Sequence, residues 1–134
     1  MTAIAKHAEV QKNGTATFMA RVLGESGVAI QQSDVAGIAY SVYLLDENDP
    51  NAESVVTGHS AVSVSVASAV FDSLQGADPR WDATRLAGGY NFLHTLSIAA
   101  NQAFSLRGRR YLVRFTFTPA SGQMLHVDYL LAVR

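Results

Sequence analysis

Apolar and polar side chains alternate with a period of two along much of this chain. The alternating runs are TATFMARVL (15–23), GIAYSVYLL (37–45), SAVSVSVAS (60–68), RRYLVRFTF (109–117) and MLHVDYLLAV (124–133). In the first run, Phe18, Ala20 and Val22 fall on one face and the residues between them on the other. Such alternation, rich in valine, threonine and aromatic residues, is typical of half-buried β-strands.

Turn signals separate these runs at short intervals, among them GESG, DENDPN, QGADP and PASG. This spacing favours a β-sandwich or a small barrel. Helical signal is weak: Ser33 in SDVAG (33–37) could cap one short turn, and GADPRWDATRLA (76–87) could form another. The length of 134 residues suits one domain. We expect an N-terminal arm at residues 1–13 and a sandwich domain at residues 14–134.

The C-terminal third is the most diagnostic part of the pattern. Gly108 precedes Tyr111, which opens an alternating strand, and PASG connects that strand to the last one. An immunoglobulin-type sandwich ends in this way, with a tyrosine-corner hydroxyl bonded to nearby backbone. The cysteine pair of antibody domains is absent, and Trp81 falls in a loop. The predicted fold class is therefore all-β, an immunoglobulin-like antiparallel β-sandwich with an N-terminal arm.

Charge and composition narrow the function classes. Ten basic and eleven acidic residues give a formal net charge of -1, which argues against binding nucleic acid by neutralising phosphates. Charged residues are 16% of the chain and hydrophobic ones 49%, so part of the surface is expected to be covered by partners. With no cysteine, thiol catalysis, zinc–thiolate sites and disulfides are excluded.

The beginning of the chain, MTAIAKHAEVQKNGTATF, lacks the apolar core of a Sec-type signal peptide. No run approaches the roughly 18 apolar residues that a membrane helix needs. We therefore expect synthesis in the cytoplasm and no membrane partner. Reaching the cell exterior would take lysis, another secretion route or a removed leader.

The loop DENDPN carries the clearest candidate metal ligands. Asp46, Asn48 and Asp49 could offer oxygens to calcium, and the run is similar to the D-x-N-D-N loop at cadherin junctions, with Pro50 in place of its last asparagine. The alternative is a solvated hairpin loop, because Asp, Asn and Pro favour turns for backbone reasons. We favour the turn, and the sequence predicts no metal and no cofactor.

The histidines offer no assembled catalytic group. His126 and Asp128 lie two apart on a predicted strand and should point outward together. They could ligate a metal, but an exposed histidine that pairs with a carboxylate or a cross-strand arginine is the simpler interpretation. His59-Ser60 and His94-Thr95 lack the glycine pattern of a nucleophile elbow. No catalytic residue is assigned.

Candidate interface residues come from three places. RGRR supplies Arg107, Arg109 and Arg110, which could grip an acidic surface or simply form a solvated turn. Ile4 is an apolar residue of the expected arm, and Trp81 lies in its loop. GGYNFLHTLSIAA (88–100) is a distinctive stretch in which Tyr90 and Phe92 share a strand face, as core packing requires.

Taken together, DVAGIAYSVYLLD, VFDSLQ, DPRWD, GYNFLHTL and YLVRFTFTPASGQMLHVDYLL resemble a family of small uncharacterised proteins of tailed phages and bacteria. The shared order is an I-x-Y-x-V strand, a tryptophan loop, a G-Y-N-F-x-H strand and a Y-x-V-x-F-x-F strand, over residues 15–133. The resemblance implies an immunoglobulin-like sandwich among virion structural genes, with no catalytic residue.

Three functions follow as hypotheses. The first is a non-enzymatic virion subunit, either a capsid decoration or cement protein or a neck or tail accessory, that forms a homo-oligomer or docks on other virion proteins. The second is a binding module for a glycan or cell-surface target, which an exposed Trp81 would favour and a buried one disfavour. The third is a metal-dependent enzyme, which would require His94, His126 and Asp128 to converge.

Overall fold

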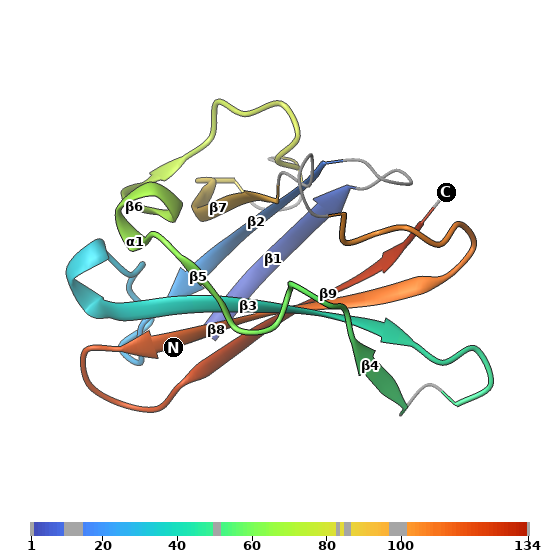
Figure 1. The fold of residues 1–134 in the computed structure, drawn as a ribbon. Helices are drawn as coiled ribbons and strands as arrows, with labels where there is room; N and C mark the ends of the chain where they lie inside the picture. The colour runs from blue at the N-terminus through green and yellow to red at the C-terminus, as the bar shows by residue number, and fades with distance from the viewer. Residues whose placement is uncertain are drawn as a thin grey trace.

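Two antiparallel sheets pack face to face in the computed structural model, which describes residues 2–9, 15–49, 52–82, 84, 87–96 and 102–133 (Figure 1). The four-stranded sheet has the order β1 (Thr2–Glu9), β2 (Ala16–Leu23), β7 (Tyr90–Leu96), β6 (Val70–Gln75). The other sheet has the order β4 (Glu53–Val55), β3 (Val35–Leu45), β8 (Arg110–Pro119), β9 (Leu125–Ala132), and β5 (Val62–Val64) also pairs with β3. The predicted all-β sandwich is confirmed.

The core lies between the sheets and is rich in aromatic rings. Phe18 and Phe92 from the four-stranded sheet meet Phe115 at centroid distances of 5.2 and 5.1 Å, and Phe92 meets Phe117 at 5.0 Å. These pairs are edge-to-face, the arrangement that aromatic quadrupoles favour. The prediction that Phe18, Ala20 and Val22 share one face of β2 is confirmed, because all three are fully buried in this core.

The strand order corresponds to A-B-E-D and C′-C-F-G of an immunoglobulin-type sandwich. Tyr111 is buried at the start of β8, and its hydroxyl accepts a hydrogen bond from the Leu106 backbone N–H at 3.2 Å. The hydrogen bond expected of a tyrosine corner is therefore present. The finer assignment, an immunoglobulin-like fold, stays a prediction that the order and this contact support.

The prediction of an N-terminal arm is wrong over Thr2–Glu9. These residues form β1, an edge strand that pairs antiparallel with β2, with an irregularity between Ile4 and Lys6. Their sequence, TAIAKHAE, alternates poorly, because alanine contributes little contrast between the two faces. Backbone pairing with β2, rather than a side-chain pattern, makes this segment a strand. Residues 1 and 10–13 of the predicted arm lie outside the described residues.

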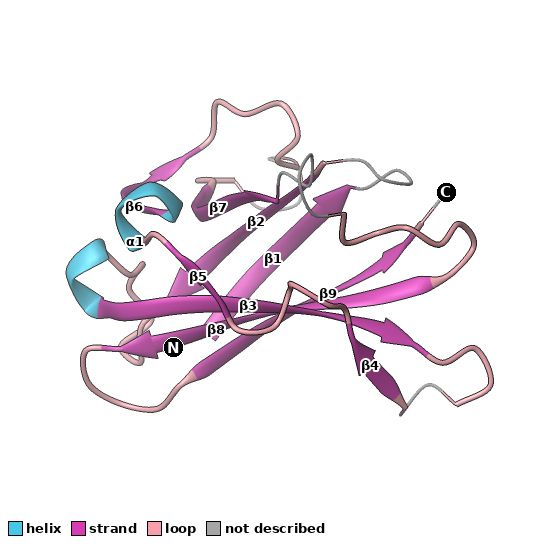
Figure 2. Ribbon diagram, viewed as in Figure 1, coloured by secondary structure: helices cyan, strands magenta, loops and turns pink. Residues whose placement is uncertain are grey.

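The run SAVSVSVAS forms a shorter strand than its alternation predicts. Only Val62–Val64 pair with β3; the chain then turns through α1 (Val66–Ala69) into β6, which pairs with β7 of the other sheet. Alternation ends because the chain changes sheets here. The other helical segment, η1 (Gln32–Asp34), lies near α1 (Figure 2). The Gln32 side-chain amide joins them by donating to Ala67 O and Val70 O.

Candidate interaction surfaces

Trp81 is buried on the outer face of the four-stranded sheet, where it is 6% exposed. It packs with Met19 and with Tyr90, whose ring centroid is 5.5 Å away. Phe71 and Leu93 complete this group, which we name the outer aromatic cluster. Met19 points away from the main core and is nevertheless fully buried, because the loop that carries Trp81 covers it.

Polar contacts hold this loop on the sheet. The Arg80 guanidinium donates to both carboxylate oxygens of Asp78, at 3.0 and 2.6 Å, and its Nη1 donates to Thr17 Oγ1 at 2.8 Å. The described residues of the 76–87 segment form turns and no helix. Trp81 therefore acts as a structural plug over Met19 and offers little surface to a partner, so its selection as an interface candidate stays a prediction.

The stretch GGYN beside this loop is held by backbone contacts. Gly89 has φ +94°, and a Cβ there would lie 1.8 Å from Gln75 O, so only glycine fits. Arg21 Nε donates to Gly89 O at 2.8 Å and its Nη2 donates to Ala87 O at 2.6 Å. The fully buried Asn91 bonds to the Val22 backbone. The sequence analysis did not single out Asn91. Its signal in the sequence was a polar residue between two aromatic residues of β7, Tyr90 and Phe92.

The loop with the candidate calcium ligands is organised as a turn. Asp46 Oδ1 accepts the backbone N–H groups of Asn48 at 2.8 Å and Asp49 at 3.2 Å, an arrangement that stabilises a turn without a metal. Pro50 and Asn51 lie outside the described residues. Within the part of the chain that the structure describes, no three histidine, cysteine or acidic side chains are grouped to hold a metal ion.

The arginine cluster and this loop meet at one end of the sandwich. Arg109 Nε lies 3.3 Å from Glu47 Oε1, and Arg109 Nη2 donates to Leu45 O at 3.0 Å. Arg107 and Arg110 are exposed, on either side of the turn that Gly108 makes. Arg109 is thus a structural link between two loops, and the other two arginines are the ones that can face a partner.

The three residues required for a metal-dependent enzyme do not converge. His94 faces the core, with its ring 5.7 Å from those of Tyr40 and Phe115, and burial lowers the pKa of its imidazole. His126 and Asp128 alternate in β9 with core residues and so lie on the outer face of the other sheet. His126 contacts the hydroxyl of Thr116 at 3.1 Å, not a carboxylate or an arginine as expected; it is Asp128 that accepts a hydrogen bond from the cross-strand Arg114, whose Nε lies 2.9 Å away.

The outer face of the five-stranded sheet carries an apolar row that crosses four strands. Val55 pairs with Tyr43, Tyr43 with Leu112, and Leu112 with Leu130, so the four side chains share one face. Val55 is 50% exposed and Leu130 is 60% exposed. We name these four residues the apolar row. The sequence signal for this row is an apolar residue at a position where alternation expects a polar one. Leu130 is an example, because it points outward between Tyr129 and Leu131, which point into the core.

A polar row flanks the apolar row on one side, and a mixed row with two charged residues flanks it on the other. The polar row consists of Ser41, Arg114 and Asp128, and the Arg114 guanidinium lies 5.9 Å from the centre of the Tyr43 ring. The hydrogen bond to Asp128 is the main cause that raises the pKa of Arg114. On the other side, Glu53 pairs with Leu45, and Arg110 with Ala132. An apolar centre with charged margins is typical of protein interfaces.

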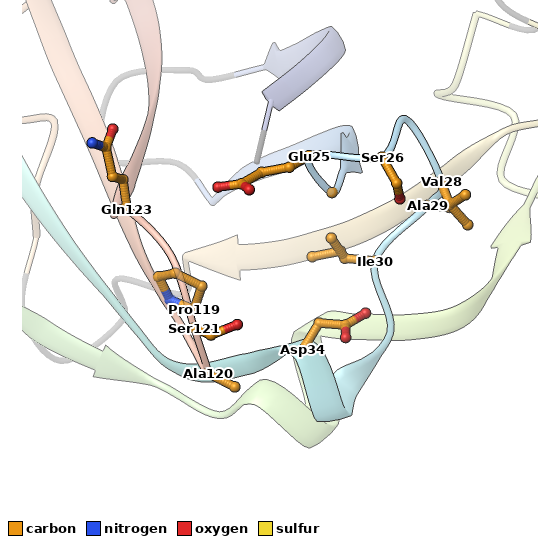
Figure 3. A pocket seen from close by; sticks show the side chains of 11 residues that line it. Glu25, Ser26, Val28, Ala29, Ile30, Asp34, Pro119, Ala120, Ser121 and Gln123 are labelled. Atoms are coloured by element: carbon orange, nitrogen blue, oxygen red, sulfur yellow. The ribbon is translucent and has the colours of Figure 1, made fainter.

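A cleft of about 530 Å³ lies between the segment before β3 and the β8–β9 hairpin (Figure 3). Glu25 and Asp34 contribute carboxylates, and the lining residues include no histidine, lysine or arginine. Asp34 already serves the fold: its side chain accepts the Gln31 N–H at 2.9 Å, and its backbone oxygen accepts the Ala120 N–H at 2.9 Å. Both contacts of Asp34 stabilise the chain at this side of the cleft.

The Ile4 side chain lies outside the described part of the chain, although its backbone belongs to β1. The interface candidates do not form one surface: β1 and Trp81 belong to the four-stranded sheet, and Arg107–Arg110 to the entry of β8.

No protein-family model, curated protein or solved structure matches this chain. In the described residues, no helix has the length and apolar character to cross a membrane.

Proposed function

We propose that this chain is a non-enzymatic structural subunit of a phage virion, a capsid decoration or cement protein or a neck or tail accessory. It acts through protein–protein interfaces and uses no cofactor. The observation that carries the proposal is the apolar row, in which Val55 and Leu130 are at least half exposed on the outer face of the five-stranded sheet. The virion is proposed as the site of action because the sequence resembles a family of small proteins of tailed phages and bacteria that implies virion structural genes.

The apolar row can supply an interface of moderate strength. Full burial of a valine or leucine side chain contributes about 1.5–3 kcal/mol, so residues that are already half buried contribute about half of that. Four such residues give a few kcal/mol before the cost of association. This suits a subunit that is present in many copies, because binding only to the assembled particle stabilises that particle by mass action.

The burial of Trp81 weakens the alternative, a module that binds a glycan or cell-surface target. The expected contact of such a module was an exposed tryptophan, and Trp81 instead fills the outer aromatic cluster. The proposed partners are other virion proteins, with neither a membrane nor a sequence-specific nucleic-acid site. Synthesis in the host cytoplasm followed by incorporation into the virion completes the proposal.

The proposal is tested on particles purified from the phage or prophage that encodes the chain. We expect peptides of the chain in the particle band at a fixed ratio to the major capsid or tail proteins. Leu130→Glu places a charge in the apolar row and should remove the chain from particles. Leu74→Glu is the matched control, because Leu74 is also exposed (37%) on a strand, but in the other sheet. Particles that never contain the wild-type chain would contradict the proposal.

A further inference from the structure

We infer that the occupant of the apolar row is a second copy of this chain, packed face to face about a two-fold axis parallel to the strands. The inference rests on the proposed function, since it names the partner of the same surface. A contact of this kind is isologous, so the same residues serve both copies and the assembly closes as a dimer.

The register of the sheet determines what such an axis brings together. The strand order β4-β3-β8-β9 is reversed in the partner, so β4 lies over the partner's β9 and β3 over the partner's β8. Val55 then meets the partner's Leu130, and Tyr43 meets the partner's Leu112. Sheets that pack face to face lie about 10 Å apart, a gap that apolar side chains from both faces fill.

The charges beside the apolar row are compatible with this axis. Arg110 lies over the partner's Leu45, one strand away from the partner's Glu53, because Leu45 and Glu53 are paired in β3 and β4. Arg114 lies over the partner's Ser41 and keeps its own Asp128. Both arginines therefore face neutral residues, with the partner's Glu53 one strand away from Arg110, and the formal net charge of -1 gives little repulsion between copies.

The other face-to-face axis, perpendicular to the strands, is disfavoured by the same charges. It would keep β8 over the partner's β8 and exchange the rows on either side of Leu112. Arg110 would then face the partner's Arg114, and like charges brought together in an interface weaken association. The arginines of β8 thus select the axis parallel to the strands.

Cross-linking tests the axis directly, because the chain has no native cysteine. A size-tagged Val55→Cys variant is mixed with an untagged Leu130→Cys variant and treated with a short bis-maleimide. We expect a cross-link between tagged and untagged copies. Leu130→Cys alone should remain uncross-linked, because the two Leu130 positions would be offset sideways by three strand spacings, about 14 Å, in addition to the gap of about 10 Å between the sheets. Leu74→Cys mixed with Leu130→Cys is the control and should give no product.

Light scattering after size exclusion measures the association itself. We expect a concentration-dependent dimer for the wild-type chain, at least tenfold weaker for Leu130→Glu and unchanged for Leu74→Glu. A monomer at all concentrations up to the millimolar range overturns the inference, as does a cross-link between two Leu130→Cys copies. A monomer that still enters particles through Leu130 refutes only the dimer. A dimer through this face that is absent from particles refutes only the proposed function.

Discussion

The side-chain amide of Asn91 takes the place of a strand backbone beside Val22. Its Oδ1 accepts the Val22 N–H at 2.7 Å, and its Nδ2 donates to Val22 O at 2.9 Å. The pairing of β2 with β7 ends just before, at Ala20 and Phe92. Nδ2 also lies 3.3 Å from Ile30 O, so one buried amide ties the end of β2 to the segment that leads to β3.

Replacing Asn91 by alanine should lower the free energy of unfolding by about 1–3 kcal/mol, because the buried Val22 N–H loses its acceptor, whereas Val22 O keeps the Ile30 N–H. Urea unfolding followed by circular dichroism measures this. Asn48→Ala is the matched control: Asn48 is exposed, and the turn contact there uses its backbone N–H. Equal effects of the two substitutions would contradict the role assigned to the Asn91 amide.

Gly89→Ala should destabilise the protein by about 3 kcal/mol or more. The added Cβ would meet Gln75 O at 1.8 Å in a backbone with φ +94°, so β6 and β7 would have to separate locally. Gly37→Ala has open space around its Cβ and no positive φ, and should be neutral or slightly stabilising. Thermal unfolding of both variants decides the point; a Gly89→Ala protein as stable as Gly37→Ala would refute the contact.

Trp81→Ala should lower the free energy of unfolding by about 3 kcal/mol, the cost of emptying a buried aromatic site. Urea unfolding must be followed by circular dichroism, because Trp81 is the single tryptophan. The dimer through the apolar row should persist wherever the variant is folded, since the outer aromatic cluster lies on the other sheet. A loss below 1 kcal/mol, as for an exposed side chain, would contradict the plug role.

The stability of the protein should fall as the pH decreases below about 6.5, the ordinary pKa of histidine. Burial lowers the pKa of His94 in the folded protein, so the unfolded chain takes up a proton at higher pH than the folded chain does. The contribution of His94 is thus present above that ordinary value and is lost as the pH falls toward the folded pKa. Chemical unfolding at several pH values measures the slope, which His94→Gln should reduce. An unchanged slope in the variant would assign the pH dependence to other groups.

Local alternation was sufficient to predict the inward faces of β2, β3, β8 and β9, since burial between two sheets requires an apolar residue at every second position. It also sufficed for the hydrogen bond of Tyr111, whose place at the start of a strand after Gly108 is a local property. The number and spacing of such strands favoured a sandwich or a small barrel, and the C-terminal pattern around Tyr111 favoured the sandwich.

Three features were decided only by the tertiary structure. TAIAKHAE became β1 because the edge of β2 offered backbone partners, which side-chain alternation does not encode. Trp81 became a plug because its loop folds back over Met19, far away in the sequence. The apolar row exists because the register of four strands aligns Val55, Tyr43, Leu112 and Leu130. Alternation assigns each residue to a face, but only the pairing of strands places residues distant in sequence next to one another.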